Sequence, residues 1–416
     1  MDKQNTAGIY KQEESKYLSF LFCSMFFLPI ITGYINEILS LSGKSTISNL
    51  TYAVVYLFGF YVLFVAIFQN FKKTLTVFAI VCIAIFLQLL LYPDVHAVFK
   101  LSGSVLEIAQ SKFFQLIVLS LSILFISMCL TGESMQWIRY YCEKYSYAVG
   151  IAYIITMLLQ FGAKNVSVYM TIAYEAMPSI LIIMYMAFIE KKKKALYMFI
   201  ICAALIFIGG CRGALLQLCI SAIIFFFINE EPILSPKKFA ILTVGIIVAF
   251  FVYLNFNRIL MLIGNYLEAH NFSSRTVRML LGSSGEGDIF HFDDRLEVYR
   301  MSIAATSTSG NGIFVYPSGI YYPHNIVLEF LLGYGYIIGT VLLLLLLFVI
   351  FKSYRAIRRT GNQFELLLWI SAFTTIFVKL MVSASYLTDR AFWFYLSLML
   401  YSIRTGGERA NDKKLS

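Results

Sequence analysis

Residues 326–351 read IVLEFLLGYGYIIGTVLLLLLLFVIF, which is the longest apolar stretch of the chain. A helix rises about 1.5 Å per residue, so about 20 apolar residues suffice to cross a hydrocarbon core of about 30 Å. Tyr322-Pro323-His324-Asn325 comes directly before this stretch, at the end of a long polar loop. The pattern predicts a membrane helix that begins beside an imidazole where membrane meets water, a suitable place for the proton acceptor of a membrane enzyme.

The composition of the whole chain is that of an integral membrane protein. Of its 416 residues, 59% are hydrophobic and 13% charged, and the mean hydropathy is +0.77, whereas soluble domains average about 25% charged residues. We therefore predict an all-α polytopic membrane protein with about 12 transmembrane helices. The first apolar run is too long for a cleavable signal, and we expect it to act as its own insertion signal. The predicted spans are 18–38, 51–68, 74–92, 113–130, 147–161, 168–189, 196–210, 213–228, 239–254, 326–351, 364–384 and 390–403.

These spans divide the chain into four parts. Residues 1–254 contain the first nine spans and residues 324–404 the last three, with 405–416 as a cytoplasmic tail. Between the two groups of spans, residues 255–323 form one long extracytoplasmic loop, and loops of this length are usually functional or disordered. We find no internal repeat of the kind that two-halved transporters show.

The long loop has a composition that predicts short helices rather than disorder. Apolar residues recur at helical spacing over 259–267, which predicts one amphipathic helix. Asp294 is followed three residues later by Glu297, a pattern typical of a helix cap. We therefore expect a second helix that begins at Arg295.

The formal charge of +10 indicates membrane orientation rather than nucleic-acid binding. With both termini in the cytoplasm, the predicted inner segments hold 21 of the 33 Lys and Arg residues and the outer segments hold 11. Residues 255–323 carry five Arg and no Lys, and all four His are on the same predicted side. Because Arg alone offers a flat fork for two phosphate oxygens, the outer side is the expected place for a phosphate-bearing substrate.

Three ionisable residues within or beside the predicted spans are further candidates. Arg212 follows Gly209-Gly210-Cys211, where a break would leave helix N-terminal amides facing an anion together with the guanidinium group. The alternative is an arginine that reaches from a helix end to the interface. Glu175 and Lys379 lie at similar predicted depth, either as a structural ion pair or as part of a substrate cavity.

Other polar residues carry weaker signals. His291, Asp293 and Asp294 lack a second ligand cluster, so we predict no metal site. Arg275 and Arg278 are open to three interpretations: surface charge, phosphate ligands or contacts with lipid headgroups. The seven Cys lie in or beside predicted spans, and we expect them to be small core residues rather than a disulfide framework.

Three motifs, taken in order, resemble the O-antigen polymerase and ligase superfamily of bacterial envelope glycosyltransferases. They cover roughly residues 209–339, and one departure is that Ile338 stands where the family commonly has a second glycine, with Gly339 following. The motifs are Cys211-Arg212-Gly213-Ala214-Leu215-Leu216; Asp294-Arg295-Leu296 with Tyr299 and Gly310-Asn311-Gly312; and Tyr322-Pro323-His324-Asn325 with Leu328, Leu331 and Gly335.

The resemblance implies a GT-C-like helical fold, an undecaprenyl-diphosphate-linked oligosaccharide donor, transfer with inversion, and no metal or other cofactor. Because Leu328-Glu329 follows the His-Asn pair, the chain looks more like the polymerases than the ligases. The function implied is polymerisation of repeat units into O-antigen or capsular polysaccharide at the outer face of the bacterial inner membrane. The alternatives are a ligase that transfers glycan to a lipid or wall acceptor, and a flippase or transporter for lipid-linked oligosaccharides. Besides membrane lipids, the implied partners are a chain-length regulator and a flippase.

The residue roles follow from the same resemblance and from the chemistry of the side chains. Arg212 and Arg295 would hold the donor diphosphate and offset its charge as it leaves. His324 would take the proton from the acceptor hydroxyl. We expect five further residues to contact substrate, namely Arg390, Asn325, Tyr299, Glu175 and Arg278.

Overall fold

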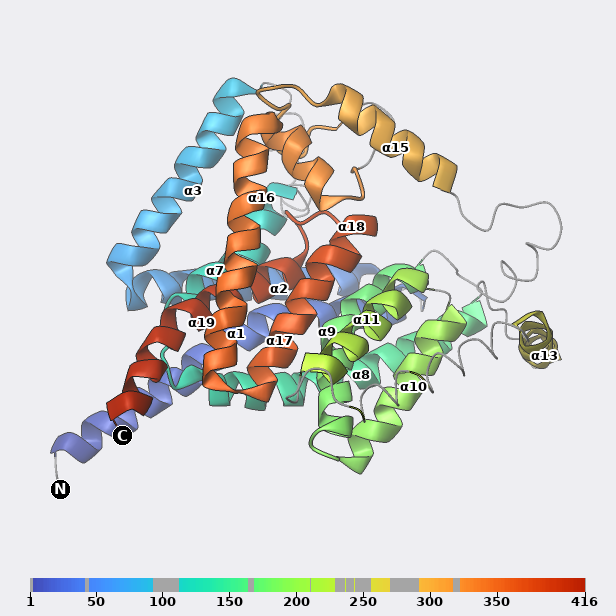
Figure 1. Ribbon diagram of the computed structural model, residues 1–416, viewed down its shortest axis with the longest axis horizontal. Helices are drawn as coiled ribbons and strands as arrows, with labels where there is room; N and C mark the ends of the chain where they lie inside the picture. Colours follow the sequence, from blue (N-terminus) through green and yellow to red (C-terminus); the bar gives the residue numbers. More distant parts are fainter. Residues whose placement is uncertain are drawn as a thin grey trace.

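The computed structural model describes residues 3–41, 45–92, 112–163, 168–209, 211–228, 236, 243, 256–269, 292–316 and 322–415. Within these ranges the regular secondary structure is helical throughout (Figure 1). Five helical segments are long and apolar enough to cross a membrane, namely Tyr10–Leu39, Leu50–Gln69, Phe71–Leu91, Thr171–Phe188 and Ile326–Thr360. These apolar helices support the prediction of a helical, membrane-embedded protein, while the number of twelve spans stays a prediction.

Every predicted span except 239–254 overlaps a helix, and that span lies outside the described residues apart from Thr243. The long helices are α1 Lys3–Leu41, α2 Ser45–Gln69, α3 Phe71–Leu91, α8 Ser134–Ala163, α9 Val168–Phe188, α10 Lys193–Gly209, α11 Arg212–Ile228, α16 Ile326–Thr360 and α19 Arg390–Leu415. The shorter elements are α6 Lys112–Phe114, the π-helix η1 Gln115–Leu121, α7 Ser122–Ser127, α13 Phe256–Ala269, α15 Phe292–Ala305, α17 Gln363–Thr374, the π-helix η2 Thr375–Lys379 and α18 Leu380–Val382.

Much of the core lies where α8 packs between α1 and α9, and α19 adds to it from its contacts with α16, α17 and α7 (Figure 1). Small side chains let α1 and α8 approach closely, since Ser15 Oγ lies 3.0 Å from Ser134 Oγ. Deeper in the core, the ring of Phe394 on α19 stacks on Phe22 and Phe26 of α1, with centroids 4.9 and 4.2 Å apart. The first and last helices are thereby held together through aromatic packing.

Burial separates central from peripheral helices. In the most apolar window of each helix, 83% of residues are buried in α9 but only 11% in α3 and 22% in α16. The exposed side chains of α3 and α16 are large and apolar, for example Ile83, Phe86, Leu344 and Phe348. A bilayer would cover such faces, because their exposure to water is unfavourable.

Helix α16 is divided at Gly335, so the prediction of one uninterrupted span over 326–351 needs correction. Gly335 has φ 78° and ψ 174°, and it separates a short arm, residues 326–334, from a long arm, residues 336–360. A Cβ atom on Gly339 would lie 2.7 Å from the Phe330 carbonyl oxygen, which places the two arms side by side. The apolar pattern does not reveal this turn, because it continues unchanged through Gly335. The backbone conformation at Gly335 is one that glycine adopts readily and other residues rarely do.

Helix α15 begins at Phe292, three residues before the predicted start at Arg295. The predicted cap, Asp294, is therefore inside the helix. Carboxylates also stabilise the first helical turn through the helix dipole, so an acidic pair fits either position. The other local predictions in this part of the chain are confirmed: α13 covers 259–267, and α10 ends at Gly209 before α11 begins at Arg212.

Candidate functional site

The short helix α18 and the residue that follows it, Ser383, bring together two of the predicted motifs. Tyr322, just before α16, donates a hydrogen bond from its hydroxyl to the Ser383 carbonyl oxygen. Tyr299 of α15 donates to the Met381 carbonyl oxygen at 3.3 Å. The arginine helix of the long loop and the His-Asn segment therefore reach neighbouring carbonyls, although they are remote from residues 381–383 in sequence.

His324 is held in an uncommon backbone conformation at this place. Its φ is +53°, a left-handed value that non-glycine residues adopt only where the surroundings enforce it. The side chain is half-buried, and its ring centroid lies 4.0 Å from that of Tyr322 at an interplanar angle of 44°. The imidazole is thus packed against a tyrosine that is itself anchored to Ser383, which fixes its position.

Asn325, which we predicted to contact substrate, caps the N-terminus of α16. Its Oδ1 accepts hydrogen bonds from the backbone amides of Val327 at 2.9 Å and Leu328 at 3.2 Å. Such a cap satisfies amides that a helix start leaves without intrahelical partners. Asn325 therefore fixes the helix start directly after His324.

The first turn of α11 lies against α9. A Cβ atom on Gly213 would overlap the Tyr174 hydroxyl group, so the tyrosine packs directly on the α11 backbone. Arg212 opens this helix, as predicted, and Tyr174 is the neighbour of Glu175. The N-terminal turn of α11, a suitable anion-binding element, therefore packs on Tyr174, whereas the Glu175 carboxylate faces α1, where its Oε2 would lie 3.5 Å from a Cβ atom on Gly33.

Glu175 and Lys379, which the sequence left open as a pair, each pair with a different residue at the start of α19. Arg390 Nη2 lies 3.0 Å from Glu175 Oε1, and Lys379 Nζ lies 2.5 Å from Asp389 Oδ2. Lys379 Nζ is also 5.9 Å from the centroid of the Tyr174 ring. Tyr174 and Glu175 are neighbours on α9, and Asp389 and Arg390 are neighbours at the start of α19. These contacts therefore connect α9, η2 and α19 to one another.

Sequence reasoning missed the part played by Glu329, which lies in the short arm of α16. Its side chain is buried, and Oε1 accepts hydrogen bonds from the Tyr316 hydroxyl at 2.8 Å and from the Ser385 hydroxyl. Oε2 accepts from the backbone amide of Tyr386 at 3.2 Å. The available signal was a single carboxylate within the 326–351 apolar run, because ionisable groups in such runs are usually functional.

A cation lies near this carboxylate. Lys112 Nζ is 5.4 Å from the Phe314 ring centroid and 5.5 Å from that of Tyr316. Burial lowers the pKa of Lys112, and the negative charge of Glu329 opposes that effect. Burial, followed by the charge of Glu329, raises the pKa of the Tyr316 hydroxyl well above its ordinary value. Tyr316 therefore keeps its proton and remains a hydrogen-bond donor to Glu329.

The glycine turn of the second motif docks on the division of α16. Asn311 N donates to the Leu332 carbonyl at 2.8 Å, and Gly312 N donates to the Gly333 carbonyl at 3.1 Å. A Cβ atom on Gly310 would lie 2.5 Å from Gly335 N, which only glycine avoids. This turn satisfies carbonyl groups at the end of the short arm that would otherwise lack partners.

Two of the predicted site residues are placed only in part, and a third is not described. Arg278 lies outside the described residues, and of Arg212 and Arg295 only the helical positions are described. Within the described ranges, no group of three or more His, Cys, Asp or Glu side chains is suited to a metal ion. Arg390 is the candidate phosphate ligand whose side chain is placed, and it pairs with Glu175.

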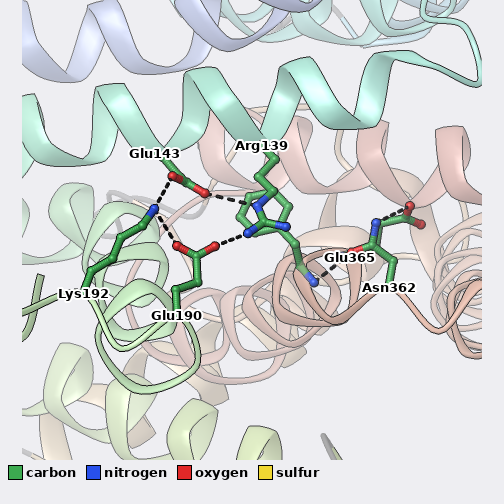
Figure 2. Close-up of polar contacts among 7 residues, drawn as sticks. Arg139, Glu143, Glu190, Lys192, Asn362 and Glu365 are labelled. Atoms are coloured by element: carbon green, nitrogen blue, oxygen red, sulfur yellow. Dashed lines mark hydrogen bonds and ion pairs between the residues drawn. The ribbon is translucent and has the colours of Figure 1, made fainter.

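A second ionic cluster links α8 to the turn between α9 and α10 (Figure 2). Lys192 Nζ contacts Glu143 Oε2 at 2.8 Å and Glu190 Oε2 at 2.6 Å, while Arg139 contacts both carboxylates. Burial would raise the pKa of Glu190, but the hydrogen bond from Lys192 and the charge of Arg139 outweigh it, so the pKa is lowered. This cluster lies on the predicted inner side, and no local sequence pattern indicates it, because its ion pairs join residues up to 51 positions apart.

The sequence matches no protein-family model and no curated protein. The resemblance to O-antigen polymerases therefore rests on the three motifs and on their order. The structural arrangement adds that the second and third motifs contact residues 381–383, and that the first motif packs on Tyr174 of α9.

Proposed function

We propose that this chain is a membrane glycosyltransferase that polymerises undecaprenyl-diphosphate-linked repeat units into O-antigen or capsular polysaccharide at the outer face of the bacterial inner membrane. The observation that supports it most is the meeting of separate motifs around residues 379–390. Tyr322 and Tyr299 contact residues 381–383, and Arg390 contacts Glu175, which follows Tyr174, the residue of α9 that packs on the α11 start. A base and an anion site within one region are what transfer from a diphosphate donor requires.

In the proposed reaction, His324 is neutral and accepts the proton of the acceptor sugar hydroxyl. The hydroxyl oxygen attacks the anomeric carbon of the donor and forms the new glycosidic bond. The bond between that carbon and the diphosphate oxygen breaks, and the diphosphate leaves with the electron pair and with inversion at the carbon. Positioned general-base catalysis contributes about 10² to 10⁴ in rate.

Cationic groups offset the charge that develops on the leaving diphosphate. Arg212 and Arg295 are proposed for this role, together with the amides at the start of α11. Arg390 is proposed as a further phosphate ligand, which exchanges its contact with Glu175 for a contact with the donor. A diphosphate competes well for a guanidinium group because it carries more charge than a carboxylate.

Gel analysis of lipopolysaccharide or capsule from a clean deletion strain tests the proposal. Loss of a polymerase leaves single repeats on the acceptor, loss of a ligase leaves polymer on the polyprenyl carrier, and loss of a flippase prevents repeats from reaching the outer face. Complementation with His324→Ala or Arg295→Lys should fail to restore long glycan at normal protein level. Restored long glycan with either variant would contradict its assigned role.

A reaction with purified components separates transfer from transport. The protein in detergent, given a synthetic lipid-linked repeat, should produce longer lipid-linked glycans. Redistribution of that substrate across vesicles without formation of glycosidic bonds would instead support a transporter.

A further inference from the structure

We propose that Glu329 is a positioning residue that fixes the His324 end of α16 relative to Arg390. The proposal rests on the proposed function for its catalytic consequence, but its geometric part stands on the contacts of Glu329 alone. Glu329 lies on the short arm of α16, five residues after His324 and four after the cap Asn325. Whatever holds Glu329 in place therefore also holds the segment that carries the imidazole.

Glu329 joins three separate segments of the chain. It accepts hydrogen bonds from Tyr316 in the long loop and from Ser385 and Tyr386 in the connection between α18 and α19. The ring of Tyr386 also stacks on Phe330, with centroids 4.3 Å apart and an interplanar angle of 13°. The short arm is consequently fixed to residues 385–386 by polar and aromatic contacts on adjacent side chains.

The connection between α18 and α19 continues this link to Arg390. The amide of Asp389 donates to the Ser385 carbonyl at 3.0 Å, which makes residues 385–389 a closed turn. Asp389 then caps α19 by accepting from the amides of Ala391 at 2.8 Å and Phe392 at 3.2 Å. Arg390 is the first residue of that helix, so the carboxylate of Glu329 and the guanidinium of Arg390 are connected through one short turn.

The contacts of this site suit an ionised carboxylate, which only accepts hydrogen bonds. The Tyr386 amide can only donate, whereas the Tyr316 and Ser385 hydroxyl groups can both donate and accept. A glutamine has the same shape, and it keeps an acceptor for the Tyr386 amide only by turning its nitrogen toward the two hydroxyl groups. It carries no charge, so it replaces charge-assisted hydrogen bonds with neutral ones about half as strong, and the turn is expected to be held less firmly.

Hydrogen exchange provides a readout that is independent of activity. In full-length protein in detergent, Glu329→Gln should speed amide exchange in residues 383–389 by about ten-fold or more, because the charge-assisted hydrogen bonds that hold residues 385–386 become neutral and weaker. The matched control is Glu297→Gln, which neutralises a carboxylate that is 63% exposed on α15 and should leave that exchange unchanged. Ser385→Ala removes one donor and keeps the carboxylate, so it serves if Glu329→Gln does not fold, with a smaller increase expected.

Steady-state elongation of a synthetic lipid-linked repeat gives the second readout. A displaced imidazole should lower kcat of Glu329→Gln by about 10- to 100-fold while KM changes by less than about three-fold, since misplacement affects chemistry more than binding. Unchanged exchange in residues 383–389 would overturn the proposal, as would increased exchange with wild-type kcat. If the wild type elongates no lipid-linked glycan but Glu329→Gln still loosens the turn, the proposed function fails and the positioning of this turn by Glu329 stands.

Discussion

The pair Lys379–Asp389 makes a sharp prediction about stability, because both side chains are buried. Their charged atoms are 2.5 Å apart, and the side chains are only 10% and 3% exposed. Removing one member of a buried pair leaves the other charge without compensation, which costs about 3–5 kcal/mol. We therefore expect Lys379→Met to lower the free energy of unfolding by about that amount.

The partner substitution needs to preserve a second role of Asp389. Its Oδ1 caps α19, and asparagine is an equally good capping residue. Asp389→Asn thus removes the charge and retains the cap, and it should destabilise the protein because Lys379 is then left buried and unpaired. In the double variant both charges are gone, so the stability should return to within about 1–2 kcal/mol of the wild type.

Unfolding in detergent, followed by intrinsic fluorescence across a temperature or denaturant series, measures the cycle. Arg300→Met is the control, because Arg300 and Glu297 form a pair at 4.0 Å whose side chains are 77% and 63% exposed. Exposed pairs contribute less than about 1 kcal/mol, so this variant should be close to the wild type. Additive losses in the Lys379→Met/Asp389→Asn double variant, or a Lys379→Met protein as stable as the wild type, would refute the reasoning.

Three further predictions concern other contacts. Glu175→Gln removes the negative charge that competes with the donor for Arg390, so KM for a lipid-linked diphosphate donor should fall by about three- to ten-fold in an elongation assay. An unchanged or higher KM would argue against Arg390 as a phosphate ligand. Gly213→Ala should lower the unfolding midpoint by an amount equivalent to about 1–3 kcal/mol, since the added methyl overlaps the Tyr174 hydroxyl; Tyr174→Phe should partly restore it, and a neutral Gly213→Ala would exclude this close approach. Because the pKa of Glu190 is lowered, its ionic contacts stabilise the fold above the ordinary glutamate pKa of 4.5 and are lost as the pH falls below that value. Glu190→Gln should therefore reduce the dependence of the free energy of unfolding on pH in the acid range. An unchanged acid slope would show that Glu190 does not contribute.

Features that depend on local sequence could be predicted. The helices at the apolar runs follow from hydropathy, and the break before Arg212 follows from Gly209 and its neighbours. The start of α16 next to His324 follows from Pro323 and the capping residue Asn325. Each of these signals lies within a few residues of the feature that it determines.

Features that depend on contacts between distant segments could not be predicted. Arg390 pairs with Glu175 across 215 positions, and Tyr386 binds Glu329 across 57. Similar depth in two helices made a Glu175–Lys379 pair reasonable, but depth does not determine which faces of the helices meet. The partner of each charge is set by helix packing, which the sequence of one helix does not encode.

Several departures from ideal backbone geometry lie in the region of the candidate site. The π-helix η2 ends at Lys379, His324 has a positive φ, and Gly335 turns α16 back on itself. The turn at Gly335 needs the conformational freedom of glycine, whereas the left-handed backbone of His324 is unfavourable for a non-glycine residue and persists because surrounding contacts enforce it. Strain of this kind is found where a protein positions functional groups, which supports a functional role for His324. Lys191, with φ 54°, has the same conformation between Glu190 and Lys192, so the inner ionic cluster is also held by an enforced turn.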